Sequence, residues 1–139
     1  MTYIHYEQTD FKHPDEEKLK QWITYTAGLE GFQTGDINII FTNDEYLYDL
    51  NRIYLNHDYY TDVITFPYNE PGIIAGDIFI SVDRVKDNAE IFNTSFEQEL
   101  NRVVIHGILH LLGYKDHTEE EKTQMRQKED FYLEKLNEL

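Results

Sequence analysis

Residues 95–117 read SFEQELNRVVIHGILHLLGYKDH and predict one long helix followed by a tight turn. Ser95 is a typical N-cap, and Gln98 three residues later completes a capping box. The apolar side chains that share one helix face are Leu100, Val103, Val104, Ile108 and Leu111. Gly113 tolerates the positive φ at which such a helix stops. The helix is therefore predicted to end at Gly113, and the chain up to His117 follows as a loop.

Strand-like segments precede this helix. Four runs are rich in β-branched and aromatic residues, namely TYIHYEQ (2–8), GDINIIFT (35–42), TDVITFP (61–67) and GDIFISV (76–82). The segment YNEPGIIA between the last two runs is too short for a helical crossover. This length predicts that the last two strands pair antiparallel.

Further helices are predicted around these strands. One begins at Pro14 and stops at Gly31, one is capped by Asn43, a short one lies near 84–92, and Thr118 with Glu121 opens the last. Because the strands come first and the helices last, we predict an α+β fold, a small mixed sheet with helices packed on it.

Composition limits the class of protein. A chain of 139 residues without a Pro/Gly/Ser linker predicts a single domain over residues 1–139. The absence of cysteine excludes disulfide scaffolds, thiolate zinc sites and cysteine nucleophiles. The opening MTYIHYEQTDFKHPDEE has no basic start or apolar run, and no apolar stretch is long enough to span a bilayer. We therefore expect a cytoplasmic protein with no membrane partner.

The net charge is strongly negative. Twenty-seven acidic side chains against twelve basic ones give −15. Such a field repels polyanions at long range. Composition alone therefore argues against DNA, RNA or anionic lipid as a partner, unless a local cation outweighs the field.

Three histidines in the quoted stretch predict a metal centre. His106 and His110 are four residues apart, so their imidazoles share one helix face, and His117 returns after the glycine turn. A lone histidine on an apolar face is usually a core residue, but burying three without a shared partner is costly. Three neutral imidazoles suit one Zn²⁺ ion with a water at the fourth position. We predict such an open, catalytic site.

The spacing of these histidines resembles the metzincin signature, in which His-Glu-x-x-His continues to a glycine and a third histidine. Gly107 stands where metzincins have the general-base glutamate, and the loop before His117 is one residue longer. Without that carboxylate a zinc peptidase lacks its proton acceptor, so a peptidase is not expected. A glycine inside a helix costs about 1 kcal/mol relative to alanine, which indicates close packing or substrate access at Gly107.

Several separate motifs resemble the YbeY family. HGILHLLGYKDH (106–117) matches the family's H-G-x-L-H-L-x-G-Y-D-H, with Lys115 as one extra residue. TDVITFP (61–67) is similar to T-D-V-L-S-F-P, GDIFIS (76–81) to G-D-I-x-I-S, and LNRIY (50–54) also fits. The resemblance implies a metal-dependent, single-strand-preferring endoribonuclease. It would act in 3′-end maturation of small-subunit rRNA and in ribosome quality control, with His106, His110 and His117 as zinc ligands.

One departure from the family pattern concerns an arginine. Many members follow L-N-x-x-Y with Arg-Gly, whereas Leu55 and Asn56 stand here, and Tyr60 replaces the usual proline. A guanidinium that grips phosphate in bidentate fashion is therefore missing. Arg52 is the one basic side chain between residues 21 and 83, so we predict that it takes over this role, or that His57 supplies part of it.

Other polar and aromatic residues have two interpretations each. Asp116 is predicted to act as a base or to orient a ligand imidazole, and the alternative is a loop aspartate bonded to its own backbone. Asp62 and Asp77 either lie near the cleft or satisfy strand-end amides, and the second is favoured. The aromatic-rich stretch comprises Tyr54, Tyr59, Tyr60 and Tyr68. These rings can stack nucleobases, although packing is the default expectation.

The expected partners follow from the resemblance and the charge. Affinity for free RNA should be modest, so we expect a ribosomal protein or a ribosome-associated GTPase to bring the protein to the small subunit and its rRNA. Two other functions stay open: a noncatalytic assembly factor with a structural metal, and a metallohydrolase of another substrate class.

Overall fold

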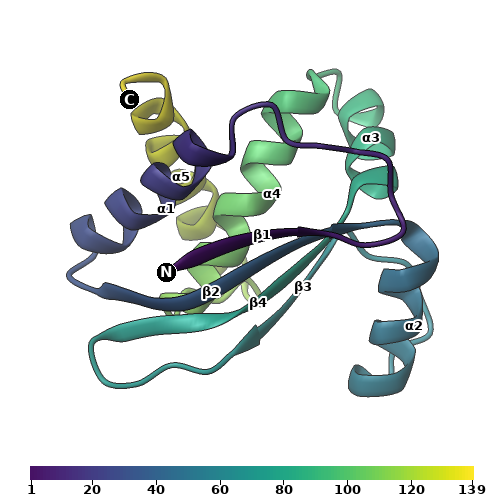
Figure 1. Ribbon diagram of the computed structural model, residues 1–139, viewed down its shortest axis with the longest axis horizontal. Helices are drawn as coiled ribbons and strands as arrows, with labels where there is room; N and C mark the ends of the chain where they lie inside the picture. The colour runs from purple at the N-terminus through teal and green to yellow at the C-terminus, as the bar shows by residue number, and fades with distance from the viewer.

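The computed structural model describes residues 1–139 as four strands and five helices (Figure 1). The strands are β1 (Thr2–Tyr6), β2 (Gln33–Thr42), β3 (Val63–Pro67) and β4 (Ile73–Ser81). The helices are α1 (Glu16–Leu29), α2 (Asp44–Leu55), α3 (Val82–Ile91), α4 (Phe96–Leu111) and α5 (Glu119–Asn137). None of the helices combines the length and the apolar character that crossing a bilayer requires.

The four strands form one mixed sheet in the order β1-β2-β4-β3. β1, β2 and β4 run parallel, and β3 pairs antiparallel with β4, as the short connection predicted. Ile39 of β2 lies beside Ile78 of β4, and Ile78 lies beside Thr65 of β3. The predicted α+β class with a small mixed sheet is confirmed.

The hydrophobic core lies between the sheet and the helices on one of its faces. In Figure 1, α1, α4 and α5 lie on this side, whereas α2 lies on the other. Alternate residues of the strands point into the core, among them Ile37, Ile39, Ile74, Ile78 and Ile80. They meet the apolar stripe of α4, of which Leu100, Val104, Ile108 and Leu111 are buried. Because this stripe faces the core, the rotation of α4 about its axis is fixed, and His106 and His110 come to lie at the edge of the buried face.

Gly107 lets α4 lie directly on the central strand β4. A Cβ atom at this position would stand 2.8 Å from Cγ2 of Ile78, closer than side chains pack. Of the two explanations for a glycine inside this helix, the structure supports close packing. The neighbouring His106 is thereby held at a fixed depth against the sheet.

The ends of α4 and α5 match the capping predictions with one exception. Ser95 accepts from the Gln98 amide, but the Gln98 side chain accepts from Thr94 Oγ1 instead of closing the box, so that half of the prediction is wrong. The box of Thr118 and Glu121 is complete. At the far end of α4 the chain leaves through Gly113 with φ of 103°.

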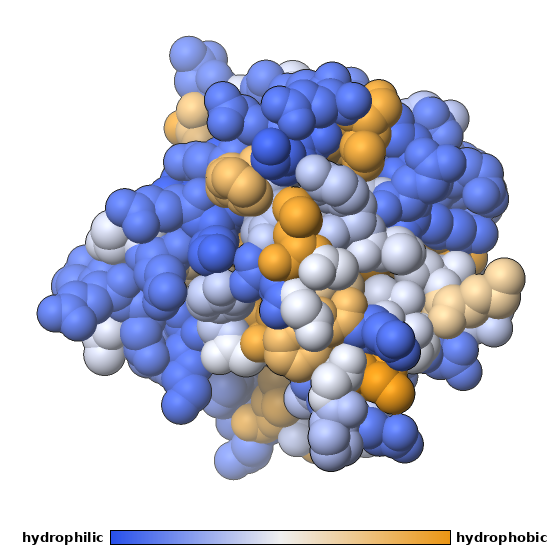
Figure 2. Space-filling view, turned by 90° about the vertical axis from the view of Figure 1, so that its left-hand side faces the viewer, coloured by the Kyte–Doolittle hydropathy of each residue, from blue (hydrophilic) through white to orange (hydrophobic).

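The surface agrees with the high acidic content. The face shown in Figure 2 is dominated by hydrophilic residues, and hydrophobic residues appear there as small patches near its middle.

Candidate metal centre

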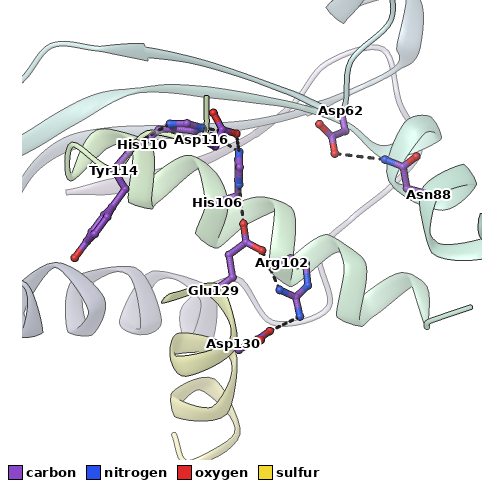
Figure 3. A network of polar contacts seen from close by, with 9 residues as sticks. All are labelled: Asp62, Asn88, Arg102, His106, His110, Tyr114, Asp116, Glu129 and Asp130. Carbon is purple, nitrogen blue, oxygen red and sulfur yellow. Dashed lines mark hydrogen bonds and ion pairs between the residues drawn. The ribbon is translucent and has the colours of Figure 1, made fainter. Parts of the chain in front are cut away.

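The imidazoles of His106 and His110 converge from consecutive turns of α4. Their Nε2 atoms lie 2.9 Å apart, and the rings stand nearly perpendicular, at 84°. Figure 3 shows both rings pointing toward the carboxylate of Asp116, which comes from the turn after α4. The pairing predicted from the four-residue spacing is therefore present.

Hydrogen bonds to the Nδ1 atoms set the tautomers of both rings. Nδ1 of His106 donates to Oε2 of Glu129 at 2.7 Å, and Nδ1 of His110 donates to the carbonyl oxygen of Tyr114 at 3.0 Å. A ring that carries its proton on Nδ1 presents Nε2 as a lone pair. Two such lone pairs 2.9 Å apart repel each other unless a cation is shared between them. A metal ion fits this requirement.

Asp116 completes a group of three metal-binding side chains. Its Oδ2 atom lies 3.3 Å from Nε2 of His106 and 3.6 Å from Nε2 of His110. One ligand atom from each of the three residues falls within 4.8 Å of the other two. Two imidazole nitrogens and a carboxylate oxygen suit a first-row divalent metal. These three residues can therefore hold a metal ion.

His117 lies in the wall of the same cavity as this group. Its backbone N–H donates to Oε1 of Glu121 at 3.2 Å, so the capping glutamate of α5 holds the residue at the end of the turn. The converging group in the structure contains Asp116 as its third member. The role of His117 as a zinc ligand stays a prediction.

The two histidines differ in their electrostatic surroundings. Burial lowers the pKa of His106, but its hydrogen bond to Glu129 and the charges of Glu129 and Asp116 outweigh burial, so the net pKa is raised. Burial lowers the pKa of His110, and the positive charge of His106 lowers it further. The two imidazoles therefore differ in the direction of their pKa shifts because only His106 is hydrogen-bonded to a carboxylate.

A row of ion-paired side chains lies behind His106, and the sequence did not predict it. Arg102 on α4 donates to Glu129 at 2.9 Å and to Asp130 at 2.7 Å, both on α5 (Figure 3). Glu129 is only 5% exposed, so Arg102 supplies the counter-charge that its burial requires. Glu129 and His106 are 23 positions apart on different helices, so no local spacing indicates that they are paired.

The metal-binding group opens into a cavity of about 660 Å³ between α4, β3 and the loop after α2. The wall opposite α4 includes Asn51, His57, Tyr59, Thr61, Asp62 and Thr65. Most of these residues carry a hydroxyl, amide, carboxylate or imidazole group. The cavity therefore offers polar contacts around a metal ion.

Asp62, just before β3, and Asp77, on β4, have different surroundings. Asp62 lines the cavity, as the less favoured of the two interpretations proposed. Its carboxylate also accepts from the amides of Asp62 and Val63, as the favoured interpretation proposed, and from Asn88 at 3.4 Å (Figure 3). Burial raises the pKa of Asp62. Asp77 accepts from Asn38 and Tyr68 and does not line the cavity.

Two arginines bear on the question of phosphate binding. Arg52 pairs with Asp49 at 3.5 Å on the exposed side of α2 and does not line the cavity, so its predicted role stays a prediction without a contact to support it. Arg126 on α5 lines an adjoining cavity together with His106 and Asp116. It forms no ion pair there, which leaves its guanidinium available.

The tyrosine-rich stretch is exposed. The exposed fractions are 67% for Tyr54, 54% for Tyr59, 47% for Tyr60 and 62% for Tyr68. Three of the rings nevertheless pack against other rings at the edge of the fold: Tyr54 stands edge-on to Phe66, Tyr59 stacks on His57, and Tyr60 lies beside Tyr48. These contacts agree with the default expectation of packing at core edges. Tyr54, Tyr59 and Tyr60 are exposed because α2 and the loop after it lie beyond the helix-covered face of the sheet, and Tyr68 lies in the connection between β3 and β4.

A family profile described as Endoribonuclease YbeY matches residues 3–137 of the chain. The chain belongs to the YbeY family.

Curated YbeY relatives match along nearly the whole chain. A Cytophaga hutchinsonii protein named Endoribonuclease YbeY is 49% identical over 128 residues, 91% of this chain and 90% of the relative. A Flavobacterium johnsoniae protein of the same name is 49% identical over 123 residues, 88% of each chain. The solution structure of a Thermotoga maritima protein superposes with a TM-score of 0.70 at 32% identity, covering 98% of this chain and 89% of that one. The resemblance seen in the sequence motifs is thus confirmed.

Proposed function

We propose that this YbeY-family protein is a metal-dependent endoribonuclease that hydrolyses phosphodiester bonds in single-stranded RNA. The observation that carries the proposal is the pair of Nε2 atoms 2.9 Å apart, joined by Asp116 and opening into a cavity. The names of the two relatives support the same activity. We further propose that the substrate is the 3′ end of small-subunit rRNA precursors, which links the protein to ribosome quality control.

A bound divalent metal supplies a hydroxide near neutral pH and polarises a phosphoryl oxygen. The residues of the chain orient the metal ligands and transfer protons. Glu129 and the Tyr114 carbonyl orient the two imidazoles by accepting from their Nδ1 atoms. Asp62 and Asp116 bring carboxylates to the cavity, where they can accept or return a proton.

We infer that the metal is zinc, held by His106, His110 and His117 with one water. In this arrangement Asp116 is released from the ligand group. Its carboxylate would then be free to act as the general base, or to orient the ligand imidazoles. The nitrogen-rich donor set supports zinc over magnesium, because Mg²⁺ prefers oxygen ligands.

The negative charge of the chain supports a protein partner. A net charge of −15 weakens long-range attraction to RNA, so free RNA should bind modestly. We propose that a ribosomal protein or a ribosome-associated GTPase places this cytoplasmic enzyme on the small subunit.

Metal content and cleavage of an rRNA precursor test the proposal when wild type and His110→Ala are compared. Both metal and cleavage are expected to be lost in His110→Ala while the circular dichroism spectrum is kept. His5→Ala is the matched control, because His5 is an exposed histidine on the edge strand β1. Cleavage by the folded, metal-free His110→Ala variant would contradict metal-dependent catalysis.

A noncatalytic assembly factor is the second candidate. The metal-binding group joins the last turn of α4 to the loop that leads into α5, so an ion there would also stabilise the fold. This candidate predicts that metal-loaded wild type binds the small subunit but cleaves no RNA, and that removing the metal lowers the thermal unfolding temperature.

A further inference from the structure

The cavity of the metal centre has an aromatic wall on the side away from α4. His57 and Tyr59, from the loop after α2, both line it. Their rings are stacked, with centroids 5.1 Å apart and planes at 19°, and the Tyr59 hydroxyl is 3.0 Å from Nδ1 of His57. The two rings therefore form one stacked pair.

Buried Asn51 fixes both members of this pair. Its backbone carbonyl accepts from the His57 N–H at 3.1 Å, and its side-chain amide donates to the Tyr59 carbonyl at 2.9 Å. Asn51 is 1% exposed, whereas Tyr59 is 54% exposed. Asn56 turns the chain between them with φ of 55°. The hydrogen bonds of Asn51 thus fix the backbone that carries the two rings, and the Tyr59 ring stays exposed to solvent.

The chemistry of this wall is aromatic rather than cationic. Arg52 is the one basic side chain between residues 21 and 83, and it turns to Asp49 outside the cavity. A ligand at this wall therefore meets ring faces, hydroxyl and amide groups and the carboxylate of Asp62, but no lysine or arginine. The part of an RNA strand that such a wall accepts is a nucleobase, whose flat π-face stacks without a phosphate contact.

We propose that the ring pair of His57 and Tyr59 is a stacking platform for one unpaired nucleobase of the RNA strand cut at the metal centre. The inference rests on the proposed function and extends it to how the strand is held. A base inside a duplex is already stacked and cannot lie on this wall, so the platform selects single-stranded RNA. Because every base has a π-face, the selection is tolerant of sequence.

Fluorescence of 2-aminopurine in a short single-stranded RNA tests the platform. The emission of this base falls when it stacks, and binding is read in EDTA so that no turnover competes. Quenching is expected with wild type at one position of the base along the strand. Tyr59→Ala is expected to abolish that quenching and to weaken binding by about fivefold or more.

Two comparisons make the result specific. Tyr59→Phe keeps the ring and should restore quenching, and Tyr3→Ala removes an exposed tyrosine on the distant strand β1 and should change nothing. The affinity loss of Tyr59→Ala should be equal at low and high salt, because stacking releases no counterions. Steady-state cleavage should show a raised KM at nearly constant kcat.

The platform and the proposed function fail in different ways. Quenching by wild type without any cleavage on metal addition would refute the nuclease and leave an RNA-binding surface. Cleavage by Tyr59→Ala with unchanged RNA affinity and quenching would overturn the platform. If Tyr59→Ala weakens binding to the small subunit but not to the oligonucleotide, the wall contacts a protein and the inference is wrong.

Discussion

Oε2 of Glu129 lies 2.7 Å from Nδ1 of His106, so a carboxylate on α5 orients a metal-binding imidazole on α4. Arg102 balances the charge of this carboxylate from the other side, at 2.9 Å. The metal centre thus depends on the packing of two helices whose contact no local motif encodes.

Glu129→Gln is expected to lower metal affinity about 10- to 100-fold, because the amide accepts from His106 less strongly and leaves Arg102 without its buried counter-charge. The metal dissociation constant, measured by competition with a chromogenic chelator, checks this expectation. Asp130→Asn is the matched control, since Asp130 contacts Arg102 but not the histidine. An unchanged dissociation constant for Glu129→Gln would show that the bond does not support the site.

Asp116→Asn is expected to lower turnover more than metal content. The amide keeps the size of the side chain but cannot take a proton, so a base is lost whereas a nitrogen-rich ligand set survives. Bound metal per chain and kcat on an rRNA precursor, determined on the same sample, give the two values. Equal loss of both would assign Asp116 to the ligand group that the structure displays.

Arg126→Ala is expected to weaken RNA binding and to reduce the slope of log affinity against log salt by about one, as loss of one phosphate contact does. The unpaired guanidinium beside His106 and Asp116 is the reason. Binding titrations at several salt concentrations measure the slope. Arg52→Ala is the comparison variant, and a larger effect of Arg52→Ala than of Arg126→Ala would support the role predicted for Arg52 from the sequence.

Glu30→Gln is expected to destabilise the protein at neutral pH by about 1–3 kcal/mol, the cost of a lost charged hydrogen-bond partner in a half-buried cluster. Burial raises the pKa of Glu30, but hydrogen bonds from Tyr114, Tyr132 and Lys128 outweigh it, and the net pKa falls below the ordinary value. A carboxylate with a lowered folded pKa contributes its full stability above the unfolded pKa, about 4.3, and loses it as pH falls through the folded value.

The stability difference between wild type and Glu30→Gln should therefore shrink as the pH falls from 7 toward 3. Urea unfolding at each pH gives this difference, in which the titration of the other carboxylates cancels. Glu138→Gln removes an exposed carboxylate 3.4 Å from Lys135 and should show almost no difference at any pH. A difference that grows in acid would mean that Glu30 is protonated in the folded protein at neutral pH.

Local spacing predicted the parts of the centre that lie on one element. His106 and His110 converge because they occupy consecutive turns of α4, and Gly113 ends this helix where a positive φ is needed. The strand pairing of β3 with β4 followed from the short connection in the same way. In each case the residues that determine the geometry are neighbours along the chain.

Long-range contacts determine which side chain of the turn after α4 faces the two histidines, and local spacing could not predict this. The turn after Gly113 is fixed by the Tyr114 hydroxyl, which donates to Glu30 at 2.5 Å, at the end of α1. This contact spans 84 positions and acts on the turn that presents Asp116, so the loop sequence alone does not show which side chain faces the histidines. The high exposure of the tyrosines is a related case, because only the fold shows that few elements cover the loop after α2.

The position of Glu129 on the last helix also affects when the chain can bind its metal during synthesis. A ribosome polymerises residues 106–116 before it reaches residue 129, so the nascent chain carries the imidazoles while their orienting carboxylate is still missing. Metal capture should accordingly be weak during translation and become tight only once α5 docks. The protein is therefore expected to acquire its metal only after the last helix of the chain has been made.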